Sequence, residues 1–246
     1  MSDFCRLWPD GPEFRQSPHF PLGTDSVLLA DFARISQYRL GADLGCGSGA
    51  ISLLLLCRDA RVSMTGVELL PEAADIAREN MARNGLADRC RIMTGDIRNY
   101  KTDFPAGCFD FAVSNPPYFT AGSGYLPSDA GRASARAEDT CSLAELCSAA
   151  AYLVRTGGAF FMVHRPERLS EIFCAMSARG IEPKRLRMVQ HAAGTAPNLV
   201  LIEGRRGGRP GLKIEAPLIL REGDGESAEA RRIYHLDTEA RHRYER

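Results

Sequence analysis

From Arg39 onward, short apolar runs alternate with segments of helical periodicity, and this alternation limits the fold more than any other feature of the chain. Strands are predicted for RLGADL, VSMTGVE, RCRIMTGD, FDFAVS and AFFMVH; helices are predicted for GAISLLLLCRD, PEAADIARENMARNG, SLAELCSAAAYLVRTGG and RPERLSEIFCAMSARG. Such alternation indicates βαβ units and a parallel sheet. KRLRMVQH and NLVLIEGRR follow without a helix between them and predict a closing antiparallel hairpin. We therefore expect an α/β fold with a seven-stranded, mostly parallel sheet and helices on both faces.

Composition and pattern divide the chain into three parts. Residues 1–36 hold a Pro-, Phe- and Gly-rich lead-in and one helix, TDSVLLADFARI, for which Thr24 or Asp25 is the expected N-cap. Residues 37–205 carry the alternating core. Residues 206–246 contain a basic loop, a short apolar stretch and a charged C-terminal helix, and we expect this tail to pack on the core.

Charge and cysteine usage exclude several protein classes. Lys and Arg number 31, as do Asp and Glu, which argues against a uniformly basic nucleic-acid binder. Residues 151–214 nevertheless carry 11 basic and 4 acidic side chains, which fits either a local phosphate-binding face or a solvated Arg-rich surface. The 8 cysteines lack metal-ligand spacing, and the chain shows no signal pattern and no apolar stretch of about 20 residues. We expect a cytoplasmic protein with no metal site and no membrane segment.

The first strand–helix junction, DLGCGSGA over residues 43–50, predicts a ligand site. Glycines let the backbone approach a ligand, and a helix N-terminus offers unpaired N–H groups. Gly45, Gly47 and Ala50 also satisfy the loose GxGxxG/A pattern of dinucleotide binders, so an NAD-linked oxidoreductase stays open at this point. Asp43 disfavours NAD, because a carboxylate there would repel a pyrophosphate. It suits a ligand with a cationic group, such as S-adenosylmethionine.

Two more carboxylates end the next two predicted strands. Glu68 can accept hydrogen bonds from both hydroxyls of a ribose, and Asp96 can accept one from the exocyclic amine of an adenine. With Asp43, they end three successive parallel strands, whose carboxyl ends meet at the edge where doubly wound folds bind ligands. Together with the glycine loop, this favours an S-adenosylmethionine site.

The fourth predicted strand ends in Asn115-Pro116-Pro117-Tyr118, again at the binding edge. An exocyclic amine on a planar base is a poor nucleophile, because its lone pair is delocalised into the ring. Two acceptors aimed at its hydrogens, the Asn115 side-chain oxygen and the Pro116 carbonyl, would turn the lone pair toward a methyl donor. Tyr118 offers a ring face for the base, and such stacking contributes about 1–3 kcal/mol. The pattern predicts methyl transfer to an amino group by positioning, with no general base or metal required.

DLGCGSG followed by VELLPEA resembles the cofactor signature of class I S-adenosylmethionine-dependent methyltransferases. The resemblance implies their Rossmann-like fold, S-adenosylmethionine as cofactor, and catalysis by the NPPY residues Asn115, Pro116, Pro117 and Tyr118. The cofactor-binding residues it implies are Asp43, Gly45, Cys46, Gly47, Gly49, Glu68, Leu69, Asp96, Ile97 and Asn115, with Thr24 and Asp25 at the methionine end.

In methyltransferases of this kind, [DNS]PP[YFW] marks methylation of adenine, of guanine, or of a protein glutamine. Enzymes acting on glutamine typically carry a longer helical N-terminal domain, whereas about 23 residues precede the first predicted helix here. PLGTDSVLLADFA, ARAEDTCSLAEL and PNLVLIEGRRGGRPGLKIEAPLIL resemble, in that order, the tRNA1(Val) adenine-37 N6-methyltransferase family. Ala137 departs from that pattern, in which His follows Arg136. The resemblance implies N6 methylation of a tRNA adenine, with ribosomal RNA adenine, guanine N2 and a non-catalytic RNA-binding protein still open.

An RNA substrate requires phosphate contacts, and three basic stretches are candidates. The residues we expect to contact RNA are Arg132, Arg136, Lys184, Arg185, Arg205, Arg206 and Arg209. The histidines show no metal or triad spacing and receive no role, and the sequence gives no oligomeric state.

Overall fold

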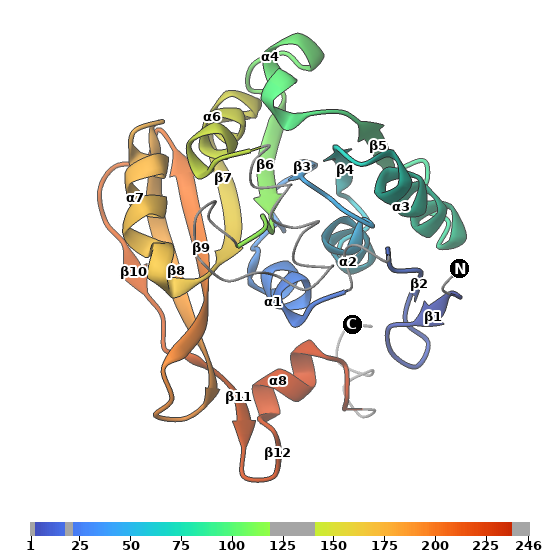
Figure 1. The fold of residues 1–246 in the computed structure, drawn as a ribbon, viewed down its shortest axis with the longest axis vertical. Coiled ribbons are helices and arrows are strands. Elements are labelled where there is room, and N and C mark those ends of the chain that lie inside the picture. Colours follow the sequence, from blue (N-terminus) through green and yellow to red (C-terminus); the bar gives the residue numbers. More distant parts are fainter. Residues whose placement is uncertain (1–2, 18–21, 119–140, 238–246) are drawn as a thin grey trace, which may run out of the picture.

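A single sheet forms the centre of the molecule (Figure 1). The computed structural model describes residues 3–17, 22–118 and 141–237. Within these ranges a 10-stranded sheet has the order β12-β11-β8-β9-β7-β6-β3-β4-β5, and β10 pairs with β8. Its strands are β3 (Leu40–Leu44), β4 (Ser63–Glu68), β5 (Cys90–Thr94), β6 (Phe109–Ser114), β7 (Val154–His164), β8 (Ile181–Ala192), β9 (Pro197–Arg206), β10 (Lys213–Ile214), β11 (Leu218–Glu222) and β12 (Gly225–Glu226).

Strand directions confirm the predicted α/β class. β3 to β7 pair in parallel, whereas β9 is antiparallel to both β7 and β8, which forms the predicted hairpin. The seven predicted strands are present, and the sheet is wider than expected because the tail adds three short strands. β10 and β11 pair in parallel with β8, and β12 pairs antiparallel with β11.

Helices cover both faces of the sheet (Figure 1). They are α1 (Thr24–Phe32), α2 (Ala50–Arg58), α3 (Pro71–Arg83), η1 (Ile97–Asn99), α4 (Tyr100–Asp103), α6 (Leu143–Leu153), η2 (Pro166–Arg168), α7 (Leu169–Ser177) and α8 (Ala228–Ile233). None of those in the described ranges is both long and apolar enough to cross a bilayer. A small hairpin, β1 (Cys5–Arg6) with β2 (Glu13–Phe14), lies apart from the main sheet.

Period-2 alternation within the strands separates two hydrophobic cores. In β6, Phe111 and Val113 are fully buried against the face covered by α1, α2 and α3. The intervening Ala112 is buried on the opposite face, with α6 and α7. Since successive strand residues point to opposite faces, a strand buried on both sides reads as a continuous apolar run, as FDFAVS does.

The helix predicted over residues 142–158 is five residues too long. α6 ends at Leu153, and β7 starts at Val154, which pairs with Phe109 of β6. Gly158 explains why this segment is a strand: a Cβ there would lie 2.3 Å from the carbonyl oxygen of Asp110. Only glycine permits so close an approach of β7 to β6, and glycine is a poor helix former.

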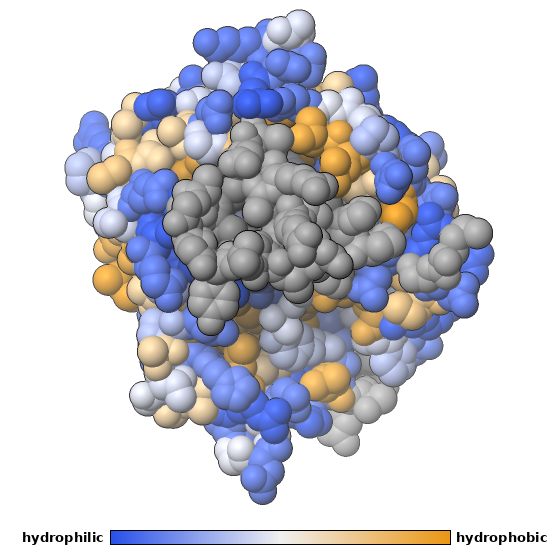
Figure 2. Space-filling view, viewed as in Figure 1, coloured by the Kyte–Doolittle hydropathy of each residue, from blue (hydrophilic) through white to orange (hydrophobic). Residues whose placement is uncertain are grey.

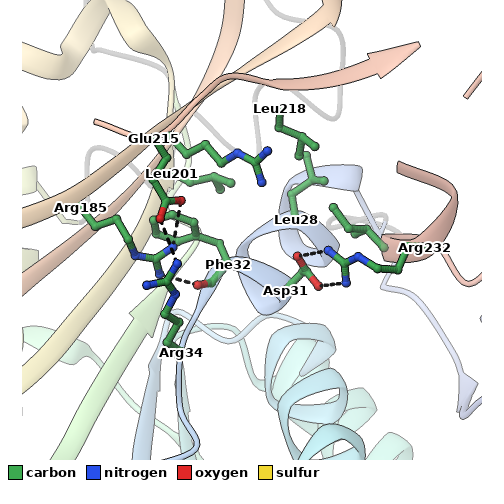
Figure 3. Close-up of a pocket in the computed structure, with 11 residues that line it drawn as sticks. Leu28, Asp31, Phe32, Arg34, Arg185, Leu201, Glu215, Leu218 and Arg232 are labelled. Atoms are coloured by element: carbon green, nitrogen blue, oxygen red, sulfur yellow. Dashed lines mark hydrogen bonds and ion pairs between the residues drawn. The ribbon is translucent and has the colours of Figure 1, made fainter. Parts of the chain in front are cut away.

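The C-terminal segment contacts α1 through ion pairs. Arg232 of α8 binds Asp31 of α1 with both guanidinium nitrogens, at 2.8 and 3.0 Å. Glu229 of α8 accepts two bonds of 2.7 Å from Arg187 of β8. Between these elements a cavity of about 260 Å³ is lined by residues of α1, β8, β9, β11 and α8 (Figure 3).

Candidate functional site

The glycine loop lies directly after β3, at the carboxyl edge of the sheet. Gly45 has φ of 76°, a left-handed conformation that favours glycine. Among the described residues, a Cβ at Gly45 would meet no atom within 4 Å. The N–H groups of Gly45 and Cys46 both donate to the carbonyl of Val67 on β4, at 2.9 and 3.1 Å. The loop is therefore fixed by its hydrogen bonds to β4, and its Gly45 side is accessible to a ligand.

Glu68, the last residue of β4, holds the same loop. Its Oε2 accepts the N–H of Gly47 at 2.9 Å, and its Oε1 accepts the N–H of Leu70 at 2.9 Å. The side chain is buried, which raises its pKa, while the backbone donors oppose that shift. Each carboxylate oxygen keeps a second lone pair, so Glu68 can still accept bonds from a ligand's hydroxyl pair.

Asp43 lies beneath the loop and is completely buried. Its Oδ2 accepts bonds from the N–H and the hydroxyl of Ser52 on α2, at 3.2 and 2.8 Å. Its Oδ1 has no hydrogen-bond partner among the residues that the structure describes, and burial raises the pKa of the carboxyl to about 7. A buried acid with an unpartnered oxygen beside a ligand loop suits a cationic ligand, because a nearby positive charge favours the ionised form.

Asp96 follows β5, and its carboxylate accepts hydrogen bonds from Arg98. Its two oxygens accept Nε of Arg98 at 3.0 and 2.9 Å, and Oδ1 also accepts the N–H of Arg98 at 2.8 Å. These bonds lower the pKa of Asp96 and leave it an ionised acceptor at this edge. Among the other expected cofactor residues, Leu69 is exposed, Ile97 is half-buried, Cys46 is buried, and Gly49 is the N-cap of α2.

The NPPY segment adjoins the glycine loop. Ser114, immediately before Asn115, donates its hydroxyl to the carbonyl oxygen of Leu44, immediately before Gly45, at 2.7 Å. β6 and β3 are neighbours in the sheet, so their two loops leave the same edge side by side. Asn115 to Tyr118 are all half-buried. The structure thus brings the predicted cofactor loop and the predicted catalytic segment together.

Hydrogen bonds join the NPPY segment to the first turn of α1. The Asn115 amide nitrogen donates to the Ser26 hydroxyl at 3.1 Å. The Tyr118 hydroxyl lies 2.7 Å from Asn115 Oδ1 and 2.6 Å from Asp25 Oδ2. Gly23 is the N-cap of α1 and no side chain caps the helix, so the predicted capping by Thr24 or Asp25 is wrong. The Asp25 carboxylate instead faces Tyr118.

Two residues that sequence reasoning left without a role lie beside Tyr118. The ring of His164, at the end of β7, has its centroid 5.1 Å from that of Tyr118. His164 is completely buried, and burial lowers its pKa to about 4. Its Nε2 has no hydrogen-bond partner within residues 3–17, 22–118 and 141–237. The Arg165 guanidinium carbon lies 5.0 Å from the centre of the Tyr118 ring. Their position directly after AFFMV, at a strand's carboxyl end, was the signal that could have identified them.

The expected RNA contacts on and after β9 lie away from this edge. Because β9 runs antiparallel to β7, Arg205 pairs with Ala159 in the middle of β7, while Val200 pairs with His164 at its carboxyl end. Five residues of strand separate the two positions, about 17 Å. Lys184 donates to the carbonyl of Arg209 at 3.0 Å, Arg205 to that of Gly157 at 2.9 Å, and Arg206 to those of Tyr152 and Val154.

Arg185 is not a surface residue, which corrects its assignment to RNA. It is 6% exposed, and its Nε donates to Glu203 at 2.8 Å. Nη1 donates to Glu215 at 3.3 Å and Nη2 to the carbonyl of Phe32 at 2.6 Å (Figure 3). A buried guanidinium requires such partners, and these occupy it. Arg132, Arg136 and Ala137 lie outside the described residues.

The surface in Figure 2, viewed as in Figure 1, is mainly hydrophilic with scattered hydrophobic patches. Leu69 and Leu70, next to Glu68, are 39% and 36% exposed. Apolar side chains beside ribose acceptors suit the flat face of a purine, because such faces gain from removal of apolar area from water.

Comparisons with known proteins agree with the geometry. The Methyltransferase small domain family matches residues 22–172. A tRNA1(Val) (adenine(37)-N6)-methyltransferase of Tolumonas auensis is 34% identical over 82% of this chain and 83% of its own length. A protein of the same name from Porphyromonas gingivalis is 33% identical over 75% and 74%.

Solved structures show the same fold. A "predicted O-methyltransferase" from Agrobacterium tumefaciens gives a TM-score of 0.71 at 20% identity and covers 86% of this chain and 95% of its own. The geranyl diphosphate C-methyltransferase of Streptomyces coelicolor, in complex with S-adenosyl-L-homocysteine, gives 0.54 at 15% identity, covering 74% and 80%.

Proposed function

The chain belongs to the tRNA1(Val) (adenine(37)-N6)-methyltransferases within the Methyltransferase small domain family, and we propose that it methylates the N6 amine of adenine 37 in a tRNA. S-adenosylmethionine supplies the electrophilic methyl group. The relatives' names favour adenine over guanine N2 or protein glutamine, and a tRNA substrate implies a location in the cytoplasm.

Four features fit the cofactor. The open space beside Gly45 accommodates a ligand against the loop, and Glu68 has free lone pairs for the ribose hydroxyls. Asp43, with its unpartnered Oδ1, supplies negative charge near the cationic end of the molecule. Asp96 is an ionised acceptor for the adenine amine. An NAD-linked oxidoreductase is the poorer candidate, since a buried acid under this loop would repel a pyrophosphate.

The observation that carries the proposal is the bond from Ser114 to the carbonyl of Leu44, which sets Asn115 beside the glycine loop. From there the Asn115 oxygen can accept one hydrogen of the target amine and the Pro116 carbonyl the other. Hydrogen bonds to a group that gains charge are worth about 1.5–3 kcal/mol each. They would hold the nitrogen lone pair toward the methyl group of the bound cofactor. The new N–C bond would replace the cofactor's S–C bond, and the amine proton, which becomes acidic on methylation, would leave to solvent.

A base must leave the anticodon-loop stack to reach this site, which costs a few kcal/mol. Stacking on Tyr118, worth about 1–3 kcal/mol, offsets part of that cost. In the structure one face of the Tyr118 ring meets Arg165, so a base that stacks there displaces or joins this guanidinium. Arg165 stands at the carboxyl edge, and we include it among the RNA contacts.

The test is methylation of a tRNA1(Val) transcript by the purified protein with S-adenosylmethionine, followed by nucleoside digestion and mass spectrometry. N6-methyladenosine is expected with the adenine-37 transcript and not with a guanine-37 transcript. Asn115→Ala should lower kcat by about a hundredfold or more, given the loss of an acceptor worth about 1.5–3 kcal/mol and of lone-pair orientation. Asn99→Ala, an exposed asparagine in η1, is the matched control. Methylguanosine as the product, or full activity of Asn115→Ala, would contradict the proposal.

A further inference from the structure

The first turn of α1 makes hydrogen bonds to the NPPY segment. Among the described residues, it makes none to the glycine loop. Asp25 Oδ2 lies 2.6 Å from the Tyr118 hydroxyl, and Ser26 binds the Asn115 amide at 3.1 Å. We propose that Asp25 is a positioning residue for Tyr118, rather than a contact to the methionine end of the cofactor. This inference rests on the proposed function, in which Tyr118 receives the target base.

The Tyr118 hydroxyl has one proton and two acceptors within reach. Burial and the neighbouring Asp25 carboxylate raise the pKa of Tyr118, so the hydroxyl keeps its single proton at neutral pH. Two acceptors lie within reach, Asp25 Oδ2 at 2.6 Å and Asn115 Oδ1 at 2.7 Å. One proton serves one acceptor, and a charge-assisted bond to a carboxylate is about twice as strong as a neutral one. The hydroxyl therefore donates to Asp25.

The consequence for Asn115 is that its Oδ1, 2.7 Å from the same hydroxyl, receives that proton only when Asp25 does not. In this arrangement the acceptor needed for catalysis is not consumed by the protein's own tyrosine. An incoming amine brings the missing N–H donor. Asp25 thus does two things at once: it fixes the plane of the Tyr118 ring, and it leaves the Asn115 oxygen available to substrate.

Hydrogen bonds from two arginines fix the C-terminal end of α1, and this fixes the position of Asp25 in its first turn. The carbonyl of Phe32 accepts Arg185 at 2.6 Å, and those of Ala30 and Ala33 accept Arg58. Cations at a helix C-terminus satisfy its last carbonyls and complement its dipole. Figure 3 shows Arg185 and Arg232 approaching α1 from separate elements, with the Arg232–Asp31 pair on the helix surface. The nine-residue helix is therefore fixed at its C-terminal end by these bonds, and its first turn holds Tyr118 through Asp25.

A double-mutant cycle on Asp25→Asn and Tyr118→Phe tests the proposal, with Asp31→Asn as control. Asp31 lies on the same helix but pairs with Arg232, so its effect should add to that of Tyr118→Phe. Four quantities are measured for each variant: the thermal unfolding midpoint without ligand, S-adenosylmethionine affinity by calorimetry, and kcat and KM on the tRNA transcript.

We expect Asp25→Asn to lower kcat/KM for tRNA about tenfold, the equivalent of one hydrogen bond, with cofactor affinity within about twofold of wild type. In the Tyr118→Phe background the same substitution should change neither kcat/KM nor the unfolding midpoint. Additive effects on the unfolding midpoint, or a tenfold loss of cofactor affinity from Asp25→Asn in both backgrounds, would overturn the inference. If the wild-type protein methylates no tRNA, the proposed function fails, and the unfolding cycle still decides whether Asp25 and Tyr118 act as a pair.

Discussion

Glu68 and Gly47 are joined by a 2.9 Å hydrogen bond from the loop N–H to the carboxylate, across 21 residues of sequence. The same carboxylate binds the N–H of Leu70, where α3 begins. One buried side chain therefore sets both the shape of the glycine loop and the start of the next helix, and its remaining lone pairs face the place where we expect the ribose. Replacement of Glu68 should therefore lower the affinity for the cofactor more than any other property.

Glu68→Ala should weaken S-adenosylmethionine binding at least about a hundredfold, because two hydrogen bonds to a charged acceptor, each worth about 1.5–3 kcal/mol, disappear. Glu68→Gln keeps one acceptor oxygen and should lose about tenfold. Calorimetry on the two variants measures both effects. Asp88→Ala, an exposed acid on a neighbouring turn, should bind as wild type does. Equal affinity of Glu68→Ala and wild type would remove Glu68 from the cofactor site.

Alanine substitutions at Gly45 and Gly85 distinguish the effect of ligand contact from the effect of backbone strain. Both have positive φ, 76° and 66°, and a Cβ at either position would meet nothing within 4 Å. Alanine at either should therefore cost about 1 kcal/mol of stability from the left-handed conformation alone. Only the methyl group at Gly45 projects toward the predicted cofactor.

We expect both variants to unfold at similarly reduced denaturant concentrations, while S-adenosylmethionine affinity falls at least about tenfold in Gly45→Ala alone. Denaturant titration and calorimetry on the same preparations measure the two effects. A cofactor affinity reduced equally in Gly85→Ala would show that strain, and not direct contact, is responsible.

Asp43 should make the free protein less stable as pH rises. Burial raises its pKa from 3.8 to about 7, so between these values the folded state holds a proton that the unfolded state has released. The free energy of unfolding therefore falls from about pH 4 to pH 7, and a difference of about three pKa units corresponds to about 4 kcal/mol. Asp43→Asn keeps a carbonyl oxygen for Ser52 but cannot ionise.

The Asn variant should thus be more stable than wild type at pH 8 and equal to it near pH 4, while its cofactor affinity is lower. Denaturant unfolding across this range measures the effect, and Asp88→Asn, an exposed aspartate, should follow the wild-type curve. A variant that is less stable than wild type at pH 8 would show that the ionised carboxylate stabilises the fold.

Residues that end a predicted strand could be placed from the sequence. Strand direction alone sends Glu68, Asp96 and Asn115 to one edge, because the carboxyl ends of parallel strands coincide there. The bond between Ser114 and Leu44 follows from the pairing of β6 with β3, which the order of elements does not specify.

Basic residues that are close in sequence do not share one surface of the fold. Arg185 resembles its neighbours in sequence, yet it is buried, and Glu203 of β9 and Glu215, directly after β10, pair with it. The reversal of chain direction in the β8–β9 hairpin moves Arg205 and Arg206 to the amino edge. The contacts of Asp25 and Ser26 with the NPPY segment span some 90 residues, and no local pattern encodes them.

Arg165 and Arg209 distinguish the two edges of the sheet as RNA surfaces. Both are exposed, but Arg165 lies over the Tyr118 ring and Arg209 lies in the loop after β9, near the amino edge. Removal of one phosphate-binding cation from the catalytic edge should weaken tRNA binding and reduce the dependence of log K on log salt by about 0.7–0.9. Arg165→Ala should therefore raise KM for the transcript about five- to tenfold and flatten its salt dependence, with S-adenosylmethionine affinity unchanged. Arg209→Ala should leave all three quantities at wild-type values. The reverse pattern would mean that the tRNA body crosses the amino edge and that Arg165 only packs against Tyr118.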